Sequence, residues 1–271
     1  KMYELMADFK ELYLMKLPNS QDEEGRKLWR SEVVKIINYL SDRFGTEITE
    51  EKLRAAVNLK NREREAQRKL SEVMMHDPAP ITGLDLFNTV YGSTFNFDKD
   101  ELVESLISLT DRIEDEYIKG NMLDKRARIL ITGCPMGSGT LKVVKAIEDN
   151  GGVVVCYENC SGYKNFDELV DEDGDDIIGA IADRYLNIGC SVMTPNGSRY
   201  KLLDKLIDQY NVDGVIDMSL TACLTYNIES KSIEKFVTEK KGIPYLSVET
   251  DYSQADVGQL NTRITAFLEM L

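Results

Sequence analysis

The stretch that decides the fold class is Arg128-Ile129-Leu130-Ile131-Thr132-Gly133-Cys134-Pro135. Its apolar run is short and stops at a glycine and a proline, which predicts a buried strand followed by a tight turn. A helix is expected from this turn to Asn150, and Val153–Tyr157 is a second run of β-favouring residues. A strand, a helix and another strand in this order predict a β-α-β unit with a parallel sheet.

The same alternation continues to the end of the chain. Strands are expected over Val212–Met218 and Pro244–Val248, and helices over 176–187, 197–210, 228–240 and 256–271. We therefore predict an α/β fold in which residues 126–271 form a Rossmann-like parallel sheet domain. In such sheets, functional sites form at the carboxyl ends of the strands.

Residues 1–125 are predicted to be mainly helical. Phe9–Leu17 is interpreted as a short strand. Asp22 is expected to cap a helix that Gly45 ends, and a long charged helix is expected from Thr49 to about Met75. Two more helices are expected over 82–92 and 98–119.

Composition excludes several classes of function. The chain has 271 residues and a formal net charge of −14, which disfavours nucleic acid and anionic membrane surfaces as partners. No apolar run reaches the roughly 20 residues of a membrane span, and no leader pattern is present, so a cytoplasmic protein is expected. The chain opens Lys1-Met2-Tyr3 without an initiator Met in front, which indicates a trimmed sequence.

Five cysteines, all in the second half of the chain, do not indicate a disulfide framework, because their number is odd and no leader pattern is present. Cys134, Cys160 and Cys223 each follow a predicted strand, so the sheet is expected to bring them to one edge. Soft thiolates hold zinc or iron–sulfur clusters, but paired CxxC spacings are absent. The alternative is that all the cysteines are small buried hydrophobes. Cys190 is interpreted as structural.

Carboxylates are predicted near the same edge at Glu158, Glu249 and Asp251, either as proton relays or as solvated loop acids. The loop from Gly133 to Thr140 resembles a phosphate-binding turn but lacks the Lys-Ser/Thr ending, so a plain strand-to-helix turn is the alternative. Only one histidine, His76, is present, which disfavours a Ser-His-Asp triad and a histidine-based zinc site.

Several longer strings resemble one family, the 2-hydroxyacyl-CoA dehydratases and benzoyl-CoA reductases, and within it the double-cubane cluster proteins. They are Ile131-Thr-Gly-Cys-Pro-Met-Gly137, Tyr157-Glu-Asn-Cys160-Ser-Gly162, the segment from Arg184 to Pro195, Ala222-Cys223-Leu-Thr-Tyr-Asn-Ile-Glu-Ser230 and the segment from Val248 to Arg263. The resemblance covers essentially the whole chain.

The resemblance implies two Rossmann-like α/β domains, with residues 1–125 as the mainly helical remainder of a truncated first one. It also implies a [4Fe-4S] or double-cubane [8Fe-9S] cluster with three cysteine ligands per subunit. It implies pairing with an identical or paralogous subunit, an ATP-dependent iron–sulfur activator protein, and a small-molecule or acyl-CoA substrate. Cys160 and Cys223 match the second and third ligands, whereas the first ligand of the family lies ahead of the segment that opens this chain. Cys134 is the hypothetical substitute, provided that its sulfur lies close enough to the other two.

The expected cluster chemistry also suggests supporting roles for neighbouring residues. Gly133 and Gly162 would let the backbone approach a bulky cluster, and Glu249 and Asp251 would donate protons. The leading function is an anaerobic reductase subunit that carries out ATP-activated, low-potential electron transfer. The alternatives are a lyase subunit that removes water from a 2-hydroxyacyl-CoA, and a non-catalytic α/β scaffold.

Overall fold

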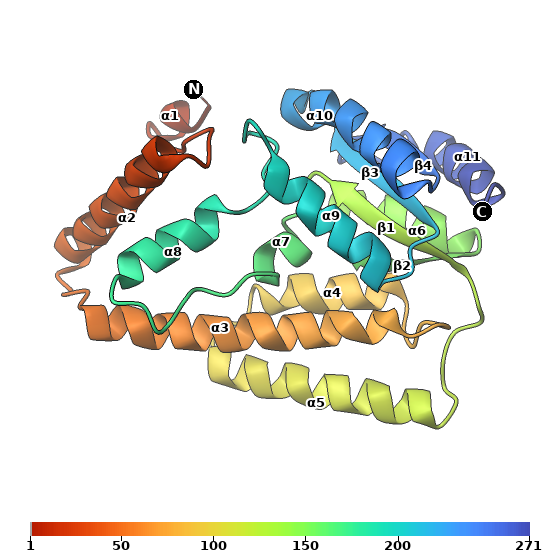
Figure 1. Cartoon of the computed structure of the whole chain (residues 1–271), viewed down its shortest axis with the longest axis horizontal. Helices are drawn as coiled ribbons and strands as arrows, with labels where there is room; N and C mark the ends of the chain where they lie inside the picture. The colour runs from red at the N-terminus through yellow and green to blue at the C-terminus, as the bar shows by residue number, and fades with distance from the viewer. Residues whose placement is uncertain (1) are drawn as a thin grey trace. The chain divides into compact units, whose positions relative to one another are not determined.

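The computed structural model describes residues 2–271 (Figure 1). The chain forms two compact units, and neither is continuous in sequence. The first contains the chain up to Asn58 together with Leu169–Asn196, and the second contains Leu59–Glu168 together with Gly197–Leu271. The domain boundary predicted at residues 125/126 stays a prediction. Among the described residues, no helix has both the length and the apolar character needed to cross a membrane.

The first unit is helical, with α1 (Met2–Met6), α2 (Glu23–Phe44), the beginning of α3 (Glu50–Glu72) and α8 (Ile177–Leu186). The expected caps of α2 are confirmed. The Asp22 carboxylate accepts a hydrogen bond from the Gly25 N–H at 2.8 Å, and Gly45 ends the helix in the left-handed conformation at φ +60°. The apolar contacts of this unit include a small cluster of Val57, Val170 and Ile177.

The prediction of a strand over Phe9–Leu17 is wrong. Residues 11–18 have no regular secondary structure, and the side chains of Phe9, Leu14 and Leu17 are exposed. A strand is stable only where a neighbouring strand takes up its backbone hydrogen bonds, and all the strands among residues 2–271 lie beyond residue 126. The apolar run therefore had the composition of a strand but no partner.

The second unit begins with helices that match the expected ones. The second half of α3 continues into a 3₁₀ turn, η1 (Val73–Met75), and is followed by α4 (Gly83–Ser93) and α5 (Lys99–Ile118). The Thr82 hydroxyl accepts from the Asp85 N–H and caps α4, while the Asp98 carboxylate accepts from the Glu101 N–H and caps α5, each at 3.0 Å.

A four-stranded parallel sheet forms the centre of the second unit, as the sequence predicts. Its strands are β1 (Ala127–Gly133), β2 (Gly152–Tyr157), β3 (Gly214–Leu220) and β4 (Tyr245–Thr250), in the spatial order β2-β1-β3-β4. Ile131 of β1 is paired with Tyr157 of β2 on one side and Ile216 of β3 on the other. All four carboxyl ends therefore lie at one edge of the sheet.

Helices cover both faces of this sheet (Figure 1). α9 (Gly197–Gln209) and α10 (Leu224–Lys235) lie on one face, and α6 (Leu141–Asp149) and α11 (Val257–Leu268) pack together on the other. The short η2 (Ser138–Thr140) precedes α6, and α7 (Tyr163–Phe166) follows β2. The helix expected over 228–240 begins earlier, at Leu224, and continues into a separate π-helical turn, η3 (Phe236–Lys241). The helical conformation ends there because Gly242 adopts the left-handed conformation at φ +71°.

Candidate functional site

Three cysteines follow three adjacent strands at the carboxyl edge of the sheet. Cys134 comes directly after β1, Cys160 lies in the loop after β2, and Cys223 lies in the loop between β3 and α10. Since β1 is hydrogen-bonded to both β2 and β3, the loop of Cys134 is the central one. The arrangement of loops expected from the sequence is therefore present.

Cys134 is buried at the base of this edge. Its backbone N–H donates to the Met218 carbonyl at 2.7 Å, and its Sγ accepts from the Leu220 N–H at 3.3 Å. The Cys223 thiol is a neighbour that influences the Cys134 thiol. Burial, with a smaller contribution from Cys223, raises the pKa of Cys134 to about 12, so its sulfur remains a neutral thiol at physiological pH.

Cys160 and Cys223 are more accessible. Cys160 is exposed, and the half-buried Cys223 stands at the start of α10. The loop of Cys160 is fastened to the loop of Cys134, because the Ser161 hydroxyl accepts from the Met136 N–H at 2.9 Å and donates to the Met136 carbonyl at 2.8 Å. Cys160 and Cys223 thus stand on loops that flank the central loop on both sides.

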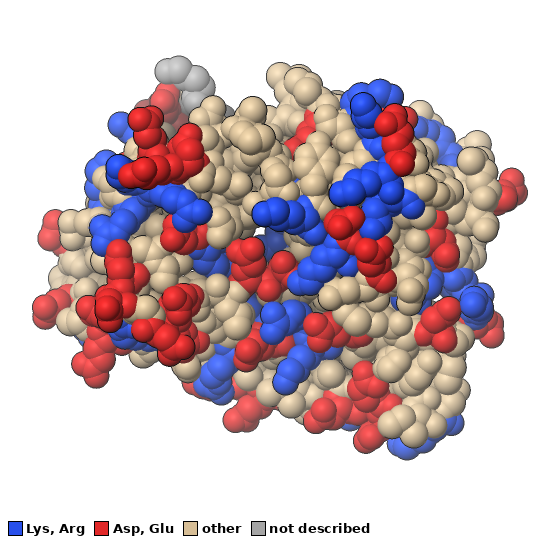
Figure 2. Space-filling model, in the orientation of Figure 1, with Lys and Arg blue, Asp and Glu red and all other residues tan. Residues whose placement is uncertain are grey.

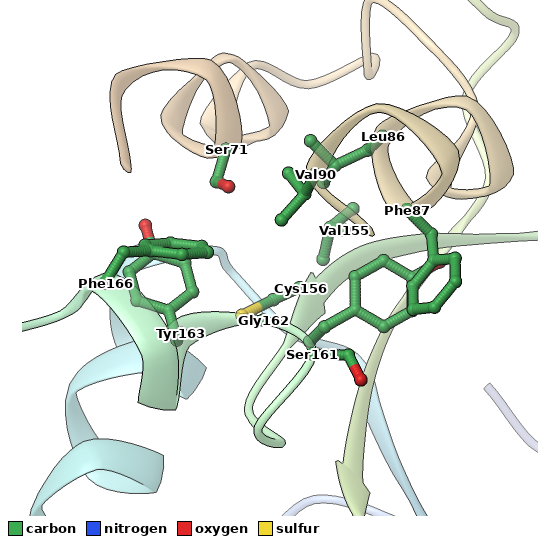
Figure 3. A pocket seen from close by; sticks show the side chains of 11 residues that line it. Ser71, Leu86, Phe87, Val90, Val155, Cys156, Ser161, Gly162, Tyr163 and Phe166 are labelled. Atoms are coloured by element: carbon green, nitrogen blue, oxygen red, sulfur yellow. The ribbon is translucent and has the colours of Figure 1, made fainter. Parts of the chain in front are cut away.

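The remaining two cysteines lie outside these three loops. Cys156 points from β2 into a small apolar pocket between Leu86, Phe87 and Tyr163 (Figure 3). Burial raises its pKa well above the usual value, as expected for a structural thiol. Cys190 belongs to the first compact unit, where its carbonyl accepts from the Asn196 side chain at 2.9 Å.

The thiols fall short of a complete cluster site. A cubane cluster is held by four ligands, most often cysteine thiolates. Within residues 2–271, no group of three or more His, Cys, Asp or Glu side chains is arranged to hold a metal ion. Cys160 and Cys223 are accessible soft donors, whereas Cys134 is buried and protonated. The predicted roles of Cys134, Cys160 and Cys223 as cluster ligands therefore stay predictions.

Gly133 and Gly162 are required by the protein's own backbone. A Cβ at Gly133 would lie 2.2 Å from the Met218 carbonyl oxygen, and one at Gly162 would lie 2.2 Å from the Tyr157 carbonyl oxygen. Gly133 also has φ +105°, a conformation that side chains disfavour. The close approaches at these glycines are thus to neighbouring strand ends, and their predicted role beside a cofactor stays a prediction.

The two predicted proton donors differ in their surroundings. Glu249 is exposed on the edge strand β4 and accepts from the Asn227 side chain at 3.2 Å, while the Asn227 N–H donates to the Cys223 carbonyl at 3.0 Å. Glu249 is therefore connected to the first turn of α10. Asp251 accepts hydrogen bonds from Ser253, which lower its pKa, and its carboxylate is ionised at neutral pH.

The loop that carries Asp251 is held by a buried lysine. Lys142 of α6 forms an ion pair with Asp256, donates to the Ser253 carbonyl, and places its Nζ 3.7 Å from an Asp251 oxygen. Its side chain is only 4% exposed, so this ammonium group is available to the loop rather than to solvent. The segment after β4 is thereby anchored to the helix that follows the central loop.

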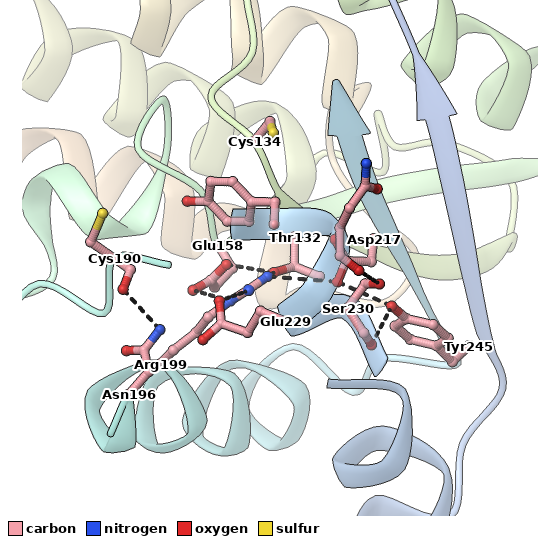
Figure 4. Close-up of polar contacts among 12 residues, drawn as sticks. Thr132, Cys134, Glu158, Cys190, Asn196, Arg199, Asp217, Glu229, Ser230 and Tyr245 are labelled. Atoms are coloured by element: carbon pink, nitrogen blue, oxygen red, sulfur yellow. Dashed lines mark hydrogen bonds and ion pairs between the residues drawn. The ribbon is translucent and has the colours of Figure 1, made fainter. Parts of the chain in front are cut away.

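Beneath the edge, Arg199 of α9 is the centre of a buried polar cluster (Figure 4). Its Nη1 lies 2.5 Å from the Glu229 carboxylate of α10, and its Nη2 donates to the Thr132 hydroxyl of β1 at 2.8 Å. At longer distances it faces Asp217 of β3 at 3.7 Å and Glu158, directly after β2, at 3.8 Å. One guanidinium group thus connects the ends of three strands with α10.

Glu158 was predicted at the rim of the site, but it is fully buried in this cluster. Lys164 Nζ lies 3.0 Å from its Oε1, and the Thr132 hydroxyl donates to its Oε2 at 2.5 Å. Burial alone would raise the pKa of Glu158, but Lys164 and Arg199 outweigh burial and lower it. Glu158 is therefore an ionised structural partner two residues before Cys160 and has no access to solvent.

Sequence reasoning missed Arg199 and Asp217, although a signal was present. Thr132 and Asp217 are polar residues within the predicted buried strands β1 and β3, and a polar residue in such a strand requires a buried partner. The identity of that partner could not be predicted from the sequence, because Arg199 lies 67 residues from Thr132 along the chain.

The fold and the thiol-lined edge define an α/β protein with cysteine-bearing loops at the carboxyl end of a parallel sheet. The family model for the 2-hydroxyglutaryl-CoA dehydratase D-component matches residues 1–271. This chain therefore belongs to that family, as the resemblance implied.

Individual relatives support the assignment. A protein of Escherichia coli (strain K12) that carries the name of a dehydratase subunit, YjiM, is 48% identical over 272 residues, covering 100% of this chain and 71% of the relative. The beta subunit of (R)-phenyllactyl-CoA dehydratase from Clostridium sporogenes is 25% identical over 93% of this chain and 66% of its own length. One subunit of benzoyl-CoA reductase from Thauera aromatica is 26% identical over 56% of this chain and 36% of its own length.

Proposed function

We propose that this chain is the iron–sulfur subunit of an ATP-activated, low-potential reductase of the double-cubane type, with Cys160 and Cys223 as two of its cluster ligands. The observation that carries the proposal is the position of these two accessible thiols, on loops after β2 and β3 on either side of the central loop. The family membership supports it. A bound cluster would supply a reversible one-electron store at low potential.

The remaining ligands have two candidate sources. Cys134 lies beside Cys223 within this chain, but it must lose a proton that its burial retains. The other source, which the resemblance implies, is a cysteine outside the 271 residues of this sequence. Whichever source applies, Cys160 and Cys223 are the positions where substitution affects iron binding most directly.

Surrounding residues have roles that follow from their contacts. Glu249, bound through Asn227 to the first turn of α10, is the proposed proton donor, whereas the ionised Asp251 is better suited to accept a proton. On the face in Figure 2, Lys and Arg alternate with Asp and Glu, as expected if the substrate is not a nucleic acid. We propose a small-molecule or acyl-CoA substrate, a second identical or paralogous subunit, a separate ATP-dependent iron–sulfur activator protein as electron donor, and a cytoplasmic location.

A measurement of iron and acid-labile sulfide tests the proposal directly. The protein is purified without oxygen, and iron, sulfide and the EPR spectrum are determined for the natural sequence and for Cys160→Ser and Cys223→Ser. About eight irons per dimer are expected for a double cubane, with a marked loss in both variants. Cys190→Ser, a half-buried thiol in the other compact unit, is the matched control and should retain its iron.

The proposal is contradicted if the protein contains no iron while Cys160 and Cys223 are intact, and a scaffold role would then remain.

A second function, a 2-hydroxyacyl-CoA dehydratase subunit, is favoured by the names of the relatives, one of which acts on (R)-phenyllactyl-CoA. Formation of the enoyl-CoA product from a 2-hydroxyacyl-CoA by the iron-loaded, activated protein separates the two functions, because a lyase removes water without net electron consumption, whereas a reductase consumes electrons from its donor at every turnover.

A further inference from the structure

The hydroxyl of Tyr245 on β4 lies between two oxygen atoms. It is 3.1 Å from Oδ2 of Asp217 and 3.0 Å from the backbone carbonyl of Ser230 (Figure 4). A tyrosine hydroxyl has one hydrogen to donate, and a backbone carbonyl can only accept. Both contacts are full hydrogen bonds only if Tyr245 donates to Ser230 and Asp217 donates to the oxygen of Tyr245. That arrangement requires a proton on Oδ2 of Asp217.

Charge balance within the cluster leads to the same conclusion. The two buried cations, Lys164 and Arg199, are matched by Glu158 and Glu229, which lie 3.0 Å and 2.5 Å from them. An ionised Asp217 would be a third carboxylate, and Arg199 approaches it only to 3.7 Å, beyond hydrogen-bonding distance. A fully buried charge without a paired, hydrogen-bonded cation is costly, so a neutral acid is the stable form.

The other oxygen of Asp217 supports this assignment. Oδ1 is buried and has no hydrogen-bond partner among the described residues. It lies against the backbone of Gly133, since a Cβ built there would be 2.6 Å from it. A carbonyl-type oxygen of a neutral acid tolerates such a position better than an oxygen of an ionised carboxylate. Burial also raises the pKa of Asp217, and Arg199 offsets that effect only in part.

We propose that Asp217 is a protonation site, a carboxylic acid that stays neutral in the folded protein at pH 7 and donates a hydrogen bond to Tyr245. It holds a proton next to Gly133, the last residue of β1, which directly precedes Cys134. It also keeps a third negative charge away from the edge where the other thiols stand. The inference does not depend on iron binding. Thr132 of β1 is paired with Asp217, and the titratable and charged groups that act on Asp217 are Glu158 and Lys164 after β2, Arg199 of α9 and Tyr245 of β4. The Cys134 thiol after β1 is also near Asp217, whereas Tyr226 and Glu229 of α10 contact Arg199.

Asp217→Asn is the informative variant, because its amide copies the shape and the donor of the neutral acid. A raised pKa means that the folded state binds one proton more than the unfolded state. The resulting stability is complete below the unfolded-state pKa of about 3.9 and is lost as pH rises towards the folded pKa. Between about pH 5 and 7, the unfolding constant of the natural protein should therefore rise up to tenfold per pH unit relative to that of Asp217→Asn.

The control for this comparison is Asp149→Asn, which changes an exposed aspartate at the end of α6 and should leave the pH dependence unaltered. The full chain is unfolded in urea at several pH values for each variant. The proposal is overturned if Asp217→Asn has the same pH dependence as the natural protein.

Infrared difference spectroscopy on the folded chain tests the proton without relying on unfolding. With ¹³C-labelled aspartate, the natural protein at pH 7 should show the carbonyl band of a protonated carboxyl group, and Asp217→Asn should lack it. Glu229→Gln removes one carboxylate from Arg199, so Asp217 should ionise to replace it and the band should disappear. Absence of the band from the natural protein at pH 7, or its persistence in Asp217→Asn, contradicts the proposal.

Discussion

Arg199→Met removes the guanidinium group that holds the strand ends of the second unit together. Arg199 is fully buried, and it donates to Thr132 and pairs with Glu229. The substitution leaves an apolar chain in its place, while Glu158 keeps only Lys164 as a cation. We expect a large loss of stability, because the carboxylate of Glu229 is left without its closest partner.

The magnitude follows from the burial of the pair. Breaking a buried ion pair by removing one partner costs about 3–5 kcal/mol. No reduction for solvent screening applies to Arg199, whose side chain is 0% exposed, although Glu229 at 13% exposure places the value towards the lower end. Because whole domains are stable by about 5–15 kcal/mol, the variant should unfold far more easily. In the double variant Arg199→Met/Glu229→Gln, we expect about 1–3 kcal/mol of this loss to be recovered.

The assay is urea unfolding at pH 7.5, followed by far-UV circular dichroism. Trp29, the only tryptophan, belongs to the first compact unit, so its fluorescence does not report on the second. The control is Arg62→Met, which removes an exposed pair with Asp100 at 2.7 Å and should cost about 0–1 kcal/mol. The reasoning is refuted if Arg199→Met costs no more than Arg62→Met.

Three further predictions concern the edge of the sheet. At pH 8, iodoacetamide should label Cys160 rapidly in the folded chain and Cys134 only after unfolding, because burial raises the pKa of Cys134. Mass spectrometry measures both rates, and equal rates would contradict the conclusion that Cys134 is a buried neutral thiol. Gly133→Ala should lower the free energy of unfolding by about 2 kcal/mol or more, whereas Gly137→Ala, where a Cβ meets nothing closer than 3.6 Å, should stay near the natural value. Lys142→Met should cost about 3 kcal/mol and speed amide exchange in the loop after β4; unchanged exchange there would show that the lysine does not hold the loop.

The positions of the strands and helices were largely predictable because their signals are local. Asp22 and Gly45 mark the two ends of α2 by their own hydrogen bond and dihedral angle. The apolar strands alternate with helices, and in a parallel sheet this alternation places every strand's carboxyl end at one edge. The expectation that Cys134, Cys160 and Cys223 follow strands at that edge needed no knowledge of side-chain packing.

The segment from Phe9 to Leu17 shows where local signals fail. Its composition is that of a strand, but a strand is defined by hydrogen bonds to a neighbour, which a single segment does not contain. The prediction that Glu158 lies at the rim of the site was wrong for a related reason. Its position after β2 was predicted, whereas its burial depends on Lys164 and Arg199, which reach it from other elements.

By itself, the sequence determined the α/β class, the order of the strands along the chain, and the family, through long strings of residues that need no structure to be recognised. Tertiary structure alone decided which polar side chains meet. Arg199 contacts residues 30 and 67 positions away, and Tyr245 reaches Asp217 across 28 positions, because four strands and two helices converge on one buried volume. Protonation states depend on these side-chain contacts, because burial and neighbouring charges set the pKa of each group. Neither burial nor neighbouring charge can be predicted from the local sequence.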